Sequence, residues 1–110
     1  MARNGLAIDG RLDSLSVKRV TPAGLPVVEG VIDHHSSQVE AGLPRAVMAL
    51  VPFVALGEMA NVVAAAPLGT LLEANGFIAA RSAKSGRLVL HVTEIRFVEG
   101  NQDGFQTQAS

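Results

Sequence analysis

Short runs in which apolar and other side chains alternate are the feature that most constrains the fold of this chain, because side chains on a β-strand point alternately to opposite faces. In the first run Leu6 and Ile8 alternate with Ala7 and Asp9, and Gly10 indicates a bend. Gly76 indicates a bulge or bend in the fourth run. The alternation predicts five strands, at residues 6–17, 27–37, 45–57, 70–81 and 88–98.

One stretch breaks this pattern between the third and fourth strands. Met59, Val62, Val63 and Ala66 recur at helical spacing, and Pro67 ends the pattern. We therefore expect a short helix over 58–68 whose apolar stripe closes one end of a barrel.

Five strands with a helix after the third are the element order of the OB fold, an all-β barrel whose second and third strands and adjoining loops commonly bind nucleic acid. Other small β-barrels have a similar alternation. The first loop is expected at 18–26, which holds two prolines and a glycine, and the last at 82–87. We predict one domain at 1–98 and a disordered polar tail at 99–110.

Composition excludes some classes of function. The 110 residues include no cysteine, which rules out a disulfide framework and a thiolate metal site, and the net charge is only -1. The first ten residues lack the features of a signal peptide, and the most apolar stretch, 46–56, is too short to span a membrane. We expect a soluble, cytoplasmic protein.

Basic residues gather near the two loops with which an OB barrel binds its ligand. Exposed loops carry lysine and arginine in any protein, but their concentration at these two loops favours nucleic-acid binding. Six of the nine basic residues lie in or beside the expected loops or rims: Lys18, Arg19, Arg45, Arg81, Lys84 and Arg87.

The segment Asp33–Ser37, with the sequence DHHSS, contains residue types found in metal and hydrolytic sites. On a strand His34 and His35 point to opposite faces, so that only Asp33 and His35 share one, and two ligands are too few for a structural zinc. We expect His34 at the edge of the core. His91 has two possible orientations, toward the binding groove or toward solvent, and we expect it to face solvent. No phosphate-binding glycine loop of the nucleotide-binding type is present. We expect no metal and no cofactor, and a hydrolase using Asp33 and His35 is a remote alternative.

Three segments carry a resemblance to a known family. They are TPAGLPVVEGVIDHHSSQVEAGLPR at 21–45, NGFIAARSAKSG at 75–86 and LVLHVTEI at 88–95. They resemble the family of primosomal replication protein N (PriB), a relative of the single-stranded DNA-binding proteins. The resemblance covers about residues 4–100, and 40–42 (Glu-Ala-Gly) is its most specific piece.

The resemblance implies an OB-fold homodimer that binds single-stranded DNA without catalysis and works with the PriA helicase and DnaT in replication restart. The family's DNA-contacting positions correspond to Arg19, His35, Leu43, Met48, Lys84 and Arg87. Together with the loop charges, this predicts a nucleic-acid-binding site of Lys18, Arg19, His35, Arg45, Met48, Lys84 and Arg87.

Leu43 and Met48 stand where better-known members of the family carry a stacking aromatic residue, and the chain has no Trp or Tyr. Weaker DNA binding that depends mainly on phosphate contacts is therefore expected. The same observation supports an alternative, a protein-interaction barrel with weak or lost DNA binding.

Overall fold

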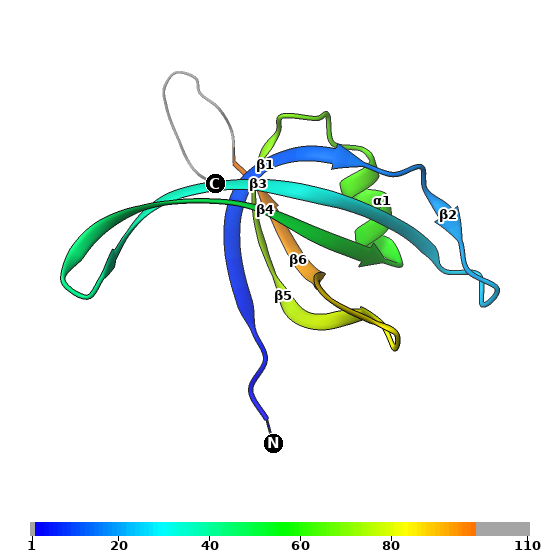
Figure 1. Ribbon diagram of the computed structural model, residues 1–110. Helices are drawn as coiled ribbons and strands as arrows, with labels where there is room; N and C mark the ends of the chain where they lie inside the picture. Colours follow the sequence, from blue (N-terminus) through cyan, green and yellow to red (C-terminus); the bar gives the residue numbers. More distant parts are fainter. Residues whose placement is uncertain (1, 99–110) are drawn as a thin grey trace.

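The computed structural model describes residues 2–98, which form a β-barrel with one short helix (Figure 1). The expected tail at 99–110 lies outside the described residues. Seven elements follow in chain order: β1 (Leu6–Leu15), β2 (Arg19–Val20), β3 (Pro26–Glu40), β4 (Leu43–Leu56), α1 (Glu58–Ala64), β5 (Leu71–Ser82) and β6 (Ser85–Phe97).

The five long strands close on themselves in the order β1-β5-β6-β4-β3, and β1 also pairs with β3. β4 and β6 run parallel for a short distance at Phe53 and Val54, and the other pairs are antiparallel. The helix lies between β4 and β5, where the sequence predicts it. The expected arrangement of five strands and one helix is therefore present.

The bend of β1 lets one strand pair with two neighbours (Figure 1). Its first half, from Leu6 to Arg11, pairs with β5, and its second half, from Arg11 to Leu15, pairs with β3. At the crossing a Cβ on Gly10 would lie 2.7 Å from Cγ2 of Ile32 and would collide with the backbone of β3. Glycine is required there because the two backbones approach too closely for any side chain.

The predicted boundaries differ from the structure at the loops. The first loop contains β2, and β3 and β4 extend into a long hairpin that projects beyond the barrel (Figure 1). Ala41 and Gly42 form its two-residue turn with φ of 55° and 79°, which suits the twist of paired strands. The last loop is only Ala83–Lys84, and α1 ends at Ala64, before Pro67. The predicted bulge in the fourth strand is confirmed between Asn75 and Gly76.

The core lies inside the barrel and under α1. On β4 the predicted parity is confirmed, because Val47, Ala49, Val51 and Phe53 alternate with more exposed residues. α1 buries Ala60 and Val63, while Met59 and Ala66 pack at the margin, so the helix closes one end of the barrel as predicted. The largest fully buried side chains are Phe53, Leu12, Ile32, Leu72, Leu90, Val28 and Val63.

Candidate nucleic-acid interface

A row of outward-facing side chains crosses four strands of the barrel. Glu29 on β3 is in register with Val54 on β4, which is in register with His91 on β6, which in turn is in register with Phe77 on β5. Residues in register lie on the same side of a sheet. These four side chains therefore define one outer face, which we call the β3–β5 face.

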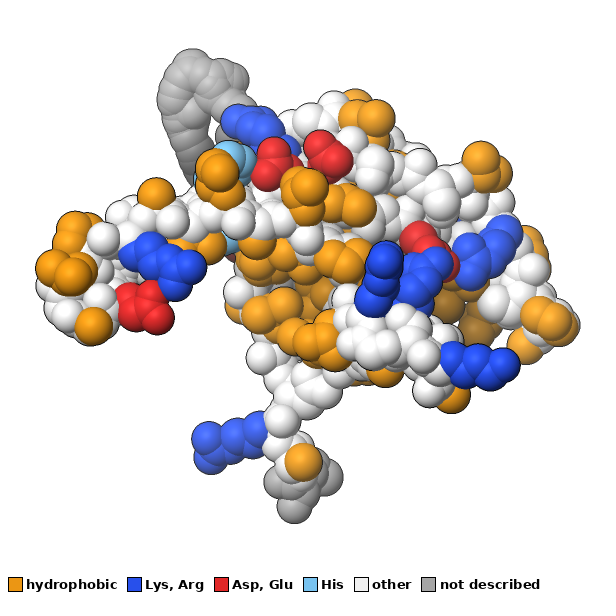
Figure 2. All heavy atoms as spheres, viewed as in Figure 1, with side chains coloured by type: hydrophobic (Ala, Val, Ile, Leu, Met, Phe, Trp, Pro, Cys, Tyr) orange, Lys and Arg blue, Asp and Glu red, His pale blue; other side chains and the backbone are white. Residues whose placement is uncertain are grey.

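Two arginines from distant parts of the chain meet on this face. Arg19 of β2 and Arg81 of β5 each place Nη2 against the Glu29 carboxylate, at 3.2 Å from Oε2 and 3.0 Å from Oε1. Figure 2 shows Lys and Arg side chains gathered around an acidic side chain on this side of the molecule. The first loop and the end of β5 are thus joined through one carboxylate.

Glu29 is held in its charged form. Burial of its carboxylate raises the pKa, but hydrogen bonds from Arg81 and Arg19 and their positive charges outweigh burial, so the pKa lies below its ordinary value. Both arginine side chains remain more than half exposed, at 53% for Arg81 and 58% for Arg19. Two exposed cations that share one anion leave a net positive charge, to which a phosphate can bind.

The remaining residues predicted near the loops have different surroundings. Lys18 donates a hydrogen bond from Nζ to Oδ1 of Asn61 on α1, at 3.0 Å. Lys84 lies in the β5–β6 turn, whereas Arg87, expected in that loop, is on β6. Within residues 2–98, no carboxylate forms an ion pair with Lys84 or Arg87. Both are therefore available to bind an anion.

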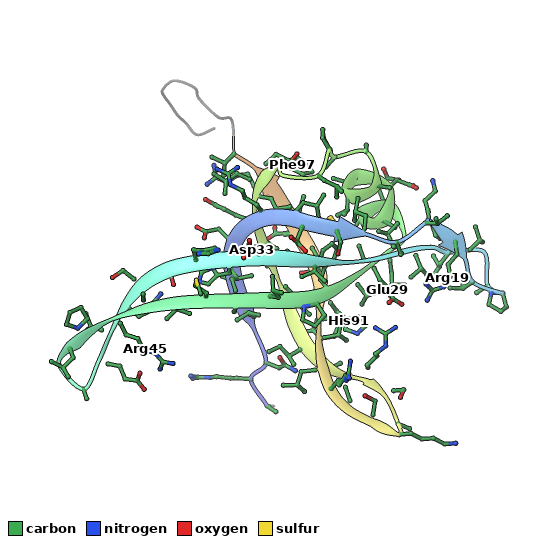
Figure 3. All side chains as sticks on the ribbon, turned by 45° about the horizontal axis from the view of Figure 1, so that its top comes forward. Arg19, Glu29, Asp33, Arg45, His91 and Phe97 are labelled. Carbon is green, nitrogen blue, oxygen red and sulfur yellow. The ribbon has the colours of Figure 1, made fainter. Side chains whose placement is uncertain are left out.

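The other predicted site residues lie along the β3–β4 hairpin. His35 places Nε2 3.1 Å from Oδ1 of Asp33, which confirms that these two side chains share a face. Met48 is opposite His35 in the register and 75% exposed. Arg45 pairs with Glu40 at 2.5 Å near the hairpin tip, far from Arg19 and Glu29 (Figure 3). The predicted residues thus form two groups, one near the loops and one on the hairpin.

The two remaining histidines differ from each other. His34 lies at the edge of the core as predicted, with Nδ1 2.7 Å from the backbone oxygen of Asp9 and Nε2 2.8 Å from Oγ of Ser36. His91 lies on the outward-facing side of β6, where it is half-buried and stacks on Phe77. Among residues 2–98 no group of three potential ligands is placed to hold a metal ion, and no helix is long and apolar enough to cross a membrane.

Sequence reasoning left Arg81, Phe77 and His91 of the β3–β5 face out of the predicted site, as well as Glu29 and Val54. Arg81 was counted among the basic residues but not selected, and Phe77 and His91 were not recognised as neighbours. Pairing the predicted fourth and fifth strands could have brought Phe77 close to His91. The bulge at Gly76 shifts that register by an amount that strand alternation does not specify.

Comparison with known proteins agrees with this architecture. A family model described as "another single-strand binding protein family" matches residues 4–94. Replication restart protein PriB of Bordetella pertussis is 39% identical over 98 residues, which cover 89% of this chain and 92% of the relative. PriB of Nitrosomonas europaea is 36% identical over 96 residues, 87% of this chain and 89% of the relative.

Solved structures show the same fold. PriB of Ralstonia solanacearum superimposes with a TM-score of 0.80 at 32% identity, over 87% of this chain and 98% of that one. The single-stranded DNA-binding protein of Thermus aquaticus gives a TM-score of 0.72 at 22% identity, over 89% of this chain and 51% of that one. The latter similarity establishes the OB fold alone. The chain belongs to the PriB family of replication restart proteins, a non-enzymatic DNA-binding family related to the single-stranded DNA-binding proteins.

Proposed function

We propose that this protein is an accessory factor of the replication-restart primosome that binds single-stranded DNA and helps assemble helicase-loading factors at stalled forks. Its family membership supports a role in restart. The meeting of Arg19 and Arg81 on the β3–β5 face carries the proposal for DNA, because the two loop regions that an OB barrel uses for binding supply them.

The proposed binding depends mainly on phosphates. The proposed phosphate contacts are Lys18, Arg19, Lys84 and Arg87, which lie in or beside the first and last loops, and Arg81 on β5 adds a further cation. The hairpin, with His35, Arg45 and Met48, extends the path for the strand. Because phosphate contacts dominate, the DNA sequence should matter little.

The proposed partners are a PriA-type helicase and DnaT, with which the protein acts in the cytoplasm as a homodimer. Exposed apolar side chains on the outer side of β4, Met48 at 75% and Leu50 at 65%, support association with another protein chain. Light scattering at tens of micromolar should give twice the mass of the 11.4 kDa chain. A mass equal to one chain would refute the dimer.

A second function, a protein-interaction barrel with weak or lost DNA binding, is favoured by the same exposed apolar residues and by the neutralising effect of Glu29 on two arginines. Titration with an oligonucleotide at several salt concentrations separates the two functions. Binding that weakens steeply with salt supports the DNA-binding function. Absence of binding at low salt supports the interaction barrel.

A further inference from the structure

Phe77 and His91 form an aromatic pair at the β5–β6 side of the β3–β5 face. Their ring centroids are 5.0 Å apart and their planes differ by 4°, so the rings are stacked with an offset. Phe77 remains 39% exposed. A large aromatic ring is thus held in place by its neighbour and is still accessible to a ligand.

The pair borders a hollow of about 430 Å³, a volume in the range of small-molecule sites. The hollow lies where β4 and β6 separate beyond their short parallel pairing, and α1 borders it at one end. Its lining is mainly apolar, and Glu58, His91 and Thr93 add polar groups to Val54, Leu56, Met59, Phe77 and Val92. Such a lining suits the flat face of an aromatic ligand.

Positive charge lies beside this hollow. A second hollow, of about 240 Å³, shares Val54, Leu56 and His91 with the first and is lined by Arg19 and Arg81. An aromatic surface and two guanidinium groups therefore adjoin each other. This combination matches a nucleotide strand, whose bases stack and whose phosphates are anionic.

No other phenylalanine among residues 2–98 has these surroundings. Phe53 is 1% exposed in the core. Phe97 is 37% exposed, but its hollow is lined by Val62, Ala65, Ala66, Pro67 and Thr70, without any cation. Figure 3 shows Phe97 away from His91 and Arg19. Among residues 2–98, Phe77 is therefore the exposed phenylalanine that lies on the same face as Arg19 and Arg81.

We propose that Phe77, supported by the His91 ring, stacks a base of bound single-stranded DNA, replacing the aromatic residues absent at Leu43 and Met48. The inference rests on the proposed function and adds a base-binding position to it. Glu58 at the helix end of the hollow repels phosphate. The sugar-phosphate backbone of the DNA therefore passes on the side of Arg19 and Arg81, and the base points toward Phe77.

The first experiment replaces the ring by an aliphatic side chain. Phe77→Leu should weaken binding of a short oligothymidylate about fivefold or more, because stacking is lost. The slope of log affinity against log salt should stay the same, because no phosphate contact is removed. Phe97→Leu, a change at an equally exposed ring, should leave affinity unaltered. Circular dichroism of each variant checks the fold.

The second experiment uses Phe77→Trp, which introduces the only tryptophan of the chain. Oligothymidylate should quench its fluorescence, whereas an abasic oligonucleotide of the same length should bind with little quenching. Phe97→Trp should not respond to either strand. If the wild type binds DNA but Phe77→Trp shows no base-dependent quenching, the stacking role is refuted and the proposed function stands. If the wild type does not bind DNA at all, both are refuted.

Discussion

Arg81 on β5 and Glu29 on β3 are joined by a 3.0 Å ion pair across 52 residues of sequence, and Arg19 binds the second oxygen of the same carboxylate. A phosphate that approaches either arginine must compete with this carboxylate. Glu29 therefore both positions the two arginines and reduces their attraction for DNA.

Glu29→Gln should tighten the binding of single-stranded DNA about two- to fivefold, since each released exposed ion pair is worth ~0.2–1 kcal/mol. The salt dependence should also become steeper. Fluorescence anisotropy with a labelled oligonucleotide measures both effects. Glu73→Gln, which removes a similar partner from Arg96 elsewhere on the barrel, is the matched control and should change neither. If Glu29→Gln binds DNA more weakly than the wild type, Glu29 contributes more by positioning the two arginines than it costs by competing with phosphate for them.

The lowered pKa of Glu29 makes a small part of the folding stability dependent on pH. A carboxyl whose pKa is lower in the folded state stabilises the fold above its unfolded pKa of ~4.3, and this contribution disappears as pH falls through the folded value. The contribution should be about 1 kcal/mol or less, because the arginine partners are well exposed. Urea unfolding of wild type and Glu29→Gln should differ at pH 7 and converge in acid. A difference that grows in acid would contradict this sign.

Replacing Lys18, Arg19, Lys84 and Arg87 together by alanine should flatten the salt dependence of DNA binding. If these residues neutralise about four phosphates, the wild-type slope of log affinity against log salt should be about -3, from ~0.7 per phosphate for single strands. The thermal midpoint should change little, since exposed charges contribute little to folding. Arg96→Ala is the control, and equal slopes for wild type and the quadruple variant would remove these residues from the interface.

Met48→Trp tests whether the hairpin contacts DNA. Met48 is 75% exposed and lies opposite His35, so a tryptophan there could stack on a base. Binding should tighten by roughly 1 kcal/mol. Leu68→Trp, at a position that is 61% exposed after α1, should have no effect. An unchanged titration for Met48→Trp would place the path of the strand away from the hairpin.

Gly10→Ala should destabilise the protein by about 1–3 kcal/mol or more, because the added methyl group would overlap the backbone of β3 and Cγ2 of Ile32. Gly5→Ala is the control, since a Cβ there meets nothing within 4 Å. Urea unfolding measures both variants. Equal stability of the two would show that β1 can shift at the crossing without cost.

Local patterns in the sequence determined most of the fold. Alternation predicted the five long strands, and helical spacing predicted α1. Gly10 predicted the bend in β1, and Gly76 predicted the bulge in β5. These features depend on residues close to one another in the chain. The ends of the elements were less accurate, because the long β3–β4 hairpin is stabilised by pairing between strands, which local composition does not reveal.

The arrangement of the candidate site was decided by the tertiary structure. The basic residues of the first loop could be identified from the sequence, but nothing local indicates that Arg19 and Arg81 share Glu29, or that Phe77 stacks on His91. Both relationships depend on the order in which distant strands pair and on the register after the Gly76 bulge. A shift of one residue in that register would turn Phe77 and Arg81 on β5 to the opposite face of the sheet, so only the closed barrel brings them together with His91 and Glu29.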